Sequence, residues 1–190
     1  KSIRLNDFAT LVLDEADRML GMGFVNDMRY VIKGMPAVRH TLFFSATITR
    51  EVEGLISEFL KEPVRISVKT GETAKNVDQD IVKVEGKPKL DILHDLLNQA
   101  EFSKVLVFGR TKHGVEKLSK LLSTRGFKTE SIHGNKSHGQ RQRALKSFKE
   151  NQVQVLIATD VAARGLDIDG ISHVINYDLP TTYEDYVHRI

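Results

Sequence analysis

The chain has 190 residues, of which 41% are hydrophobic and 28% charged, a composition typical of globular proteins. Its apolar runs fall well short of the roughly 20 residues that a membrane-spanning helix needs, and residues 1–8 lack the apolar core of a signal peptide. The absence of cysteine excludes disulfides and thiolate zinc sites, and 28 basic against 25 acidic residues give a net charge of +3. We therefore expect a cytoplasmic protein without a membrane partner, whose mild basicity permits a polyanionic partner without requiring one.

The order of apolar and amphipathic stretches predicts an α/β fold. Apolar runs of strand length alternate with stretches of helical spacing, which favours βαβ units and therefore parallel sheets. The predicted strands are 8–13, 41–44, 64–68, 81–84, 105–108, 153–158 and 173–176. Because ligands of parallel sheets bind at the carboxyl ends of the strands, the polar residues that follow these runs are the candidate site residues.

Two stretches between the predicted strands have the spacing of amphipathic helices. Gly126 stands where the C-terminal cap of the first helix belongs. The apolar residues that share one helical face are Val115, Leu118, Leu121 and Leu122 in the first stretch, and Ala144, Leu145 and Phe148 in the second.

A polar segment without apolar periodicity separates two parts of the chain. The segment KTGETAKNVDQD contains Gly71 and predicts an interdomain linker over residues 69–79. We expect a first domain over 1–68 and a second over 80–190. Since the chain begins at Lys1 in front of a predicted strand, and no stop signal precedes Ile190, we expect a fragment in which both domains are incomplete.

Three carboxylates follow the first predicted strand, in the sequence LVLDEADRML. At the carboxyl end of a parallel strand, Asp14 can hold Mg²⁺ while Glu15 positions or deprotonates the water that attacks a γ-phosphate. The same residues, with Asp17, also fit an acidic first turn stabilised by the helix dipole, with Asp14 near the N-cap. The stretch alone does not separate these two interpretations.

Hydroxyl side chains follow the second predicted strand, in TLFFSAT. Ser45 and Thr47 can form hydrogen bonds with the nearby carboxylates and so transmit the presence of a nucleotide. Taken alone, they favour an ordinary N-cap of the helix that follows, and only the two strand-end loops together favour the first interpretation.

A third polar loop, in IATDVAARGLDIDG, follows the predicted strand 153–158. Thr159 can donate to a phosphate, Arg164 can bind one through two hydrogen bonds, and Gly165 permits close approach of a backbone. Asp167 can accept a hydrogen bond from a sugar hydroxyl. The alternative is a solvated loop with internal salt bridges.

These motifs occur in the order found in DEAD-box ATP-dependent RNA helicases, which the whole chain resembles. The matching residues are Asp14-Glu15-Ala16-Asp17, Ser45-Ala46-Thr47, Thr159 to Asp167, and His188-Arg189-Ile190. The stretch IHGNKSHGQRQRALKSF is most similar to bacterial members of the RhlE type. The resemblance implies two RecA-like domains with parallel sheets, the first present only in its C-terminal part, that close over ATP and single-stranded RNA.

The resemblance also implies roles for individual residues. Asp14 would coordinate Mg²⁺, Glu15 would activate the hydrolytic water, and the link from the nucleotide to domain closure would use Asp17, Ser45 and Thr47. The second domain would bind ATP through Arg164, Gly165, Asp167, His188 and Arg189. The RNA contacts would come from Thr111, Lys112, Gly134, Arg141, Thr159 and Asp160, and contacts to phosphates and 2′-hydroxyls read little sequence.

The chain departs from the family pattern at several points. His138 stands where the family usually has glutamine, and its protonation near neutral pH would alter RNA affinity, unless it is a surface histidine without a role. The sequence contains neither a Gly-x-x-x-x-Gly-Lys-Thr loop, nor the glutamine segment that reads adenine, nor Gly-Arg-x-Gly-Arg. We therefore expect no ATPase activity from this chain alone.

For the complete protein we expect ATP binding and hydrolysis to be coupled to RNA binding and to local unwinding of short RNA duplexes. One alternative is a non-catalytic RNA clamp or assembly factor, which the pair Asp14 and Glu15 disfavours because a clamp needs no base beside a magnesium ligand. Another is a DNA translocase on the same fold, which the Asp-Glu-Ala-Asp form disfavours.

Overall fold

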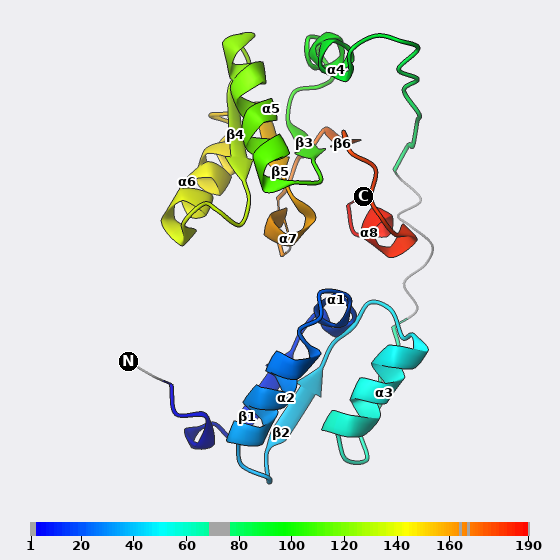
Figure 1. Cartoon of the computed structure of the whole chain (residues 1–190), viewed down its shortest axis with the longest axis vertical. Coiled ribbons are helices and arrows are strands. Elements are labelled where there is room, and N and C mark those ends of the chain that lie inside the picture. Colours follow the sequence, from blue (N-terminus) through cyan, green and yellow to red (C-terminus); the bar gives the residue numbers. More distant parts are fainter. Residues whose placement is uncertain (1–2, 69–76, 164, 167, 190) are drawn as a thin grey trace. The chain divides into compact units, whose positions relative to one another are not determined.

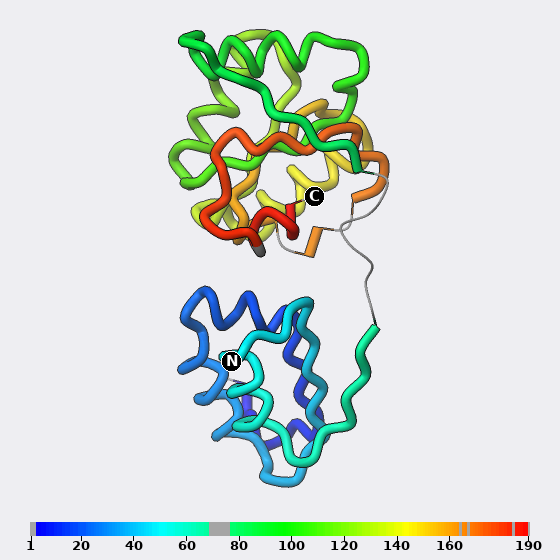
Figure 2. Tube along the Cα trace, turned by 90° about the vertical axis from the view of Figure 1, so that its right-hand side faces the viewer, coloured from blue at the N-terminus to red at the C-terminus, as the bar shows by residue number. Residues whose placement is uncertain are grey.

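The computed structural model describes residues 3–68, 77–163, 165–166 and 168–189, which belong to two compact units (Figure 1). The first unit is Lys1–Lys69 and the second is Thr70–Ile190. Figure 2 follows the Cα trace of each unit from a second direction. None of the helices in the described ranges is long and apolar enough to cross a membrane.

The first unit contains a parallel pair of strands packed against helices. Its elements are η1 (Leu5–Asp7), β1 (Thr10–Leu13), α1 (Ala16–Gly21), α2 (Val25–Gly34), β2 (His40–Phe43) and α3 (Arg50–Phe59). In the register of the pair, Leu13 lies opposite Phe43, so both strands end at the same edge. A core of Leu11, Leu13, Met28, Met35, Leu55 and Phe59 joins β1 to α2 and α3.

The second unit is a four-stranded parallel sheet with the strand order β4-β5-β3-β6. Its strands are β3 (Val105–Phe108), β4 (Thr129–Ile132), β5 (Val155–Ala158) and β6 (His173–Asn176). Its helices are α4 (Lys89–Leu97), α5 (Lys112–Thr124), α6 (His138–Lys149), α7 (Asp160–Ala163) and α8 (Tyr183–Val187). The parallel sheets confirm the expected α/β fold class.

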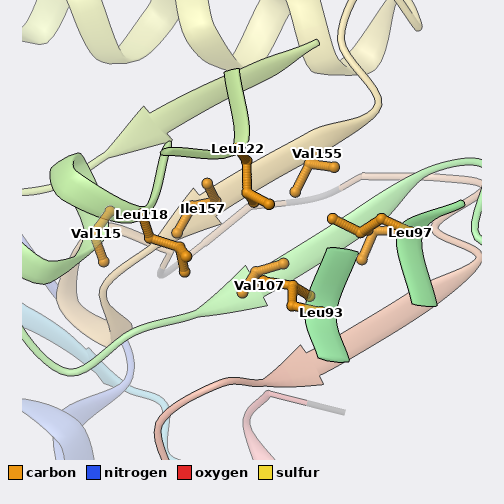
Figure 3. Close-up of a cluster of buried hydrophobic side chains, with 9 residues drawn as sticks. Leu93, Leu97, Val107, Val115, Leu118, Leu122, Val155 and Ile157 are labelled. Carbon is orange, nitrogen blue, oxygen red and sulfur yellow. The ribbon is translucent and has the colours of Figure 1, made fainter. Parts of the chain in front are cut away.

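Helices cover both faces of this second sheet, so its central strands are buried on both sides. On one face, α4 and α5 direct Leu93, Leu118 and Leu122 against Val107 and Ile157 (Figure 3). On the other face, Ala144 and Phe148 of α6 pack on Leu106, Leu156 and Ile132. All four residues of β3 and of β5 are buried, which explains why these strands read as continuous apolar runs.

Several predicted elements differ from the structure. The predicted strands 64–68 and 81–84 are wrong, since neither segment pairs with a strand in the described ranges, and Val64 and Ile66 are exposed. Strand β4 was not predicted. Leu121, expected on the apolar face of α5, is 37% exposed, and most of the predicted linker lies outside the described residues.

Candidate functional site at the carboxyl ends of the strands

The carboxylates of the first unit follow β1 directly. Asp14 is exposed, and its Oδ1 accepts a hydrogen bond from the backbone N–H of Glu15 at 2.9 Å. Glu15 is the N-cap of α1 and adopts the left-handed conformation, with φ 51° and ψ 44°, without a side-chain cap hydrogen bond. Such a conformation costs a residue other than glycine roughly 1–2 kcal/mol. The N–H of Ala16 donates to the Phe44 carbonyl at 3.1 Å, which holds this turn against the end of β2.

Asp17 joins the ends of the two strands of the first unit. Its Oδ2 accepts from both the backbone N–H and the hydroxyl of Thr47, at 2.9 and 2.7 Å, and its Oδ1 accepts from the N–H of Arg18. The Ser45 hydroxyl donates to the Thr47 carbonyl at 2.6 Å. The hydrogen bond expected between a hydroxyl after β2 and a carboxylate after β1 is therefore present. The N-cap of α3 is Thr49 rather than Ser45 or Thr47.

Several candidate residues of the second unit lie where its strands end. The Thr111 hydroxyl caps α5 by accepting from the N–H of Gly114 at 3.0 Å. Lys112 donates to the Asn135 side chain at 3.0 Å, which connects the start of α5 to the loop after β4. Thr159 follows β5, is buried, and donates its N–H to the Ile132 carbonyl.

Arg189 is buried at this edge, and all three nitrogens of its guanidinium donate hydrogen bonds. It donates two hydrogen bonds to the carboxylate of Asp160, at 2.6 and 2.9 Å. Its Nη1 donates to Asn176 Oδ1 and to the Asp178 carbonyl, both at 2.8 Å. The guanidinium carbon also lies 4.8 Å from the centre of the Phe108 ring. One side chain therefore connects the segment after α8 to the ends of β3, β5 and β6.

The other expected site residues lie as follows. His188 is exposed, Arg141 is half-buried, and the Arg141 Nε is buried without a hydrogen-bond partner among the described residues. Gly165 has φ 63°, a conformation that strains any residue with a side chain, whereas a Cβ there would meet no atom within 4 Å. Arg164 and Asp167 lie outside the described residues.

Sequence reasoning missed several residues that shape this edge. Asn176 Oδ1 and the Asp178 carbonyl accept hydrogen bonds from Arg189, and Asp178 Oδ2 accepts one from the N–H of Arg110. The Phe108 ring lies against the Arg189 guanidinium. The available signal was the rule already applied to the other strands, since Asn176 ends a predicted strand and Asp178 follows it.

Two helicase families match this chain. The family described as Helicase conserved C-terminal domain matches residues 88–190, and the family described as DEAD/DEAH box helicase matches residues 1–55. ATP-dependent RNA helicase CshA of Listeria monocytogenes is 47% identical over 191 residues, and DEAD-box ATP-dependent RNA helicase CshA of Bacillus subtilis is 44% identical. These alignments cover the whole of this chain but only 37% and 39% of those two proteins. The finer resemblance to the RhlE type stays a prediction.

Solved structures of similar proteins have the same fold. S. cerevisiae Dbp5 bound to RNA and ADP BeF3 aligns with a TM-score of 0.81 and 28% identity, over 98% of this chain and 50% of that one. A DEAD box protein from the hyperthermophile Methanococcus jannaschii aligns with a TM-score of 0.58 and 35% identity, over 99% of this chain and 51% of that one. Because the C-terminal helicase family covers more than half of the chain and the DEAD/DEAH box family covers its first part, the chain belongs to the DEAD-box helicase family.

Proposed function

We propose that this chain is part of an ATP-dependent RNA helicase that couples ATP binding and hydrolysis to RNA binding and local unwinding of short RNA duplexes. The observation that carries the proposal is the position of Asp14 and Glu15 at the end of β1, beside the hydrogen bonds that Asp17 makes to the end of β2. Residues 1–68 would belong to the first RecA-like domain, 69–79 to a linker, and 80–190 to the second domain.

Asp14 would hold Mg²⁺ on the nucleotide. The described residues contain no group of three or more His, Cys, Asp or Glu side chains that could hold a metal ion by itself, but a nucleotide-borne Mg²⁺ needs only one or two carboxylates because phosphates and waters complete its shell. The exposed Asp14 carboxylate, whose Oδ1 accepts from the neighbouring N–H of Glu15, fits this need. When bound, the ion would neutralise negative charge on the phosphates.

Glu15 would orient the attacking water and accept its proton. Its left-handed backbone turns the residue out of the direction of β1 at the first position of the loop, and the Ala16 to Phe44 hydrogen bond maintains that turn. Backbone strain at a strand end is a feature of functional sites, where the surrounding structure holds a side chain in one direction. Asp17, Ser45 and Thr47 would fix the loop rather than contact the water.

RNA would bind at the strand ends of the second unit. Donors for phosphates and 2′-hydroxyls would come from backbone N–H groups and from the side chains of Thr111, Lys112 and Arg141, with Gly134 in the loop beside them. Contacts of this kind give little sequence specificity. The Asp160 carboxylate is bound by Arg189, so Asp160 would act on RNA through the position of its loop. The cytoplasmic location and the closing of two domains over ATP stay predictions.

The proposal is tested with the complete protein and short duplexes of RNA and of DNA, each with ATP. We expect RNA to stimulate ATP hydrolysis and only the RNA duplex to be unwound. Preferential unwinding of the DNA duplex would replace the proposal with a DNA translocase. Binding of RNA without any ATP hydrolysis would replace it with a non-catalytic clamp.

A further inference from the structure

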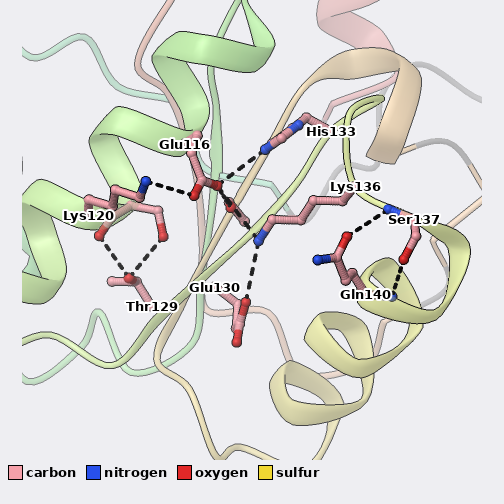
Figure 4. Close-up of polar contacts among 10 residues, drawn as sticks. Glu116, Lys120, Thr129, Glu130, His133, Lys136, Ser137 and Gln140 are labelled. Atoms are coloured by element: carbon pink, nitrogen blue, oxygen red, sulfur yellow. Dashed lines mark hydrogen bonds and ion pairs between the residues drawn. The ribbon is translucent and has the colours of Figure 1, made fainter.

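Ser131 of β4, together with His133 and Lys136 in the segment that follows β4, contacts the helix α5 at the carboxylate of Glu116 (Figure 4). Oε2 of Glu116 accepts a hydrogen bond from the Ser131 hydroxyl at 2.8 Å and lies 3.2 Å from Nε2 of His133. Lys136 Nζ lies 3.7 Å from the same oxygen. On the solvent side, Lys120 Nζ lies 3.4 Å from the other oxygen, Oε1.

Glu116 is ionised over the whole physiological range. The hydrogen bonds from Ser131 and His133, with the charge of Lys136, lower the pKa of Glu116 to about 2 despite partial burial. An ionised carboxylate can only accept, so the His133 Nε2 carries its proton and donates it. The His133 side chain is 7% exposed, and its Nδ1 has no partner among the described residues, so the bond to Glu116 is the polar contact that orients the ring.

His133 begins the loop that the proposed function places on RNA. The loop spans residues 133–137 and contains Gly134 and Asn135, the partner of Lys112. Its far end is fixed by a capping box, in which the Ser137 N–H donates to Gln140 Oε1 at 2.8 Å and the Ser137 hydroxyl accepts from the Gln140 N–H. At the near end, the Lys136 N–H donates to the His133 carbonyl at 3.0 Å, and the His133 side chain is bound by the Glu116 carboxylate of α5.

We propose that Glu116 is a positioning residue that fixes the start of loop 133–137 and thereby sets the backbone of Gly134 for RNA binding. Glu116 itself contacts no RNA in this account. The effect on RNA binding rests on the proposed function. The hydrogen-exchange rate of loop 133–137 without RNA does not, because it depends on the protein alone. Lys136 lies between Glu116 and Glu130, at 3.7 Å from each, so its charge is neutralised within the protein.

The test compares three variants of the complete protein. Glu116→Ala removes the acceptor, Glu116→Gln keeps an acceptor for Ser131 and His133, and Lys120→Gln removes the exposed partner without touching the loop. For Glu116→Ala we expect about tenfold faster hydrogen exchange in loop 133–137 without RNA. We also expect about a tenfold higher KM for RNA, with kcat at saturating RNA within about twofold. Glu116→Gln should recover most of both effects, and Lys120→Gln should show neither.

Two results would overturn the proposal. One is an unchanged loop exchange rate and RNA KM in Glu116→Ala. The other is a loss of kcat together with faster exchange throughout the second unit, which would mean general destabilisation. Should Glu116→Ala fail to fold, His133→Phe takes its place, because it removes the hydrogen bond to Glu116 while keeping a ring in the same space, and the same changes in loop exchange and RNA KM are expected. If the unsubstituted protein shows no RNA-stimulated turnover, the proposed function fails, and the exchange rates of the loop still decide the role of Glu116.

Discussion

Replacing Glu15 by glutamine in the complete protein should lower RNA-stimulated ATP turnover by about 100-fold or more, while ATP-dependent RNA binding persists. Glutamine has the size of glutamate but cannot accept the proton of the attacking water, and general base catalysis contributes about 10²–10⁴-fold. The turn that carries the residue is held by backbone hydrogen bonds, which the substitution leaves intact. Steady-state hydrolysis and RNA binding by fluorescence anisotropy measure the two properties separately.

Glu62→Gln is a matched control for this substitution. Glu62 is exposed and also adopts a left-handed conformation, with φ 45°, but it follows α3 and lies at no strand end. The control should hydrolyse ATP at the unsubstituted rate. Loss of RNA binding along with turnover in Glu15→Gln would contradict the role of Glu15 as a base, because binding precedes the chemical step.

Replacing Arg189 by lysine should destabilise the second unit by about 3 kcal/mol, even though the charge is kept. A lysine cannot reproduce the two hydrogen bonds to Asp160 together with those to Asn176 and the Asp178 carbonyl. The Arg189 side chain is 2% exposed, and a lysine would leave buried acceptors without a donor, at about 1–3 kcal/mol for each unsatisfied group. Hydrogen exchange of the amides in β3 and β5 of the complete protein should accelerate on the order of 100-fold.

Arg125→Lys is the matched control for this second prediction. Arg125 lies 2.7 Å from Asp91 in an ion pair whose side chains are 34% and 47% exposed. Pairs of this kind contribute under about 1 kcal/mol, so the exchange rates of β3 and β5 should change by no more than about fivefold. Equal changes in the exchange rates of β3 and β5 for the two substitutions would show that Arg189 stabilises the second unit no more than an exposed arginine does.

The fold was predictable where a strand is buried on both faces, because such strands are continuous apolar runs. β3 and β5 are of this kind. β4 was missed because Thr129, Glu130 and Ser131 are polar. Two of these polar side chains form hydrogen bonds with α5: Thr129 with Ser119, and Ser131 with Glu116. Such contacts cannot be seen in the sequence, because they join residues of different elements.

The opposite error arose in the segments 64–68 and 81–84. Their valines and isoleucines have high strand propensity, but a strand also needs a neighbour for its backbone hydrogen bonds, and the described residues provide none. The prediction relied on strand propensity and did not consider whether a partner strand was present. Val64, Ile66 and Ile81 are each more than 80% exposed in the structure.

The candidate site was predictable in its location rather than in its contacts. The strand-end rule found Asp17 and Thr47, which the structure joins by hydrogen bonds. Arg189 was expected on the nucleotide and Asp160 on RNA, but the structure binds these two side chains to each other. The residues are far apart in the sequence, and no local pattern shows that α8 brings them together.

The measurement that tests the central claim most directly is the RNA affinity of the complete protein with and without a non-hydrolysable ATP analogue. If ATP and RNA binding are coupled, the analogue should tighten RNA binding at least tenfold, and RNA should tighten binding of the analogue by the same factor, about 1.4 kcal/mol of coupling. Equal RNA affinity in the presence and absence of the analogue would contradict ATP-coupled RNA binding.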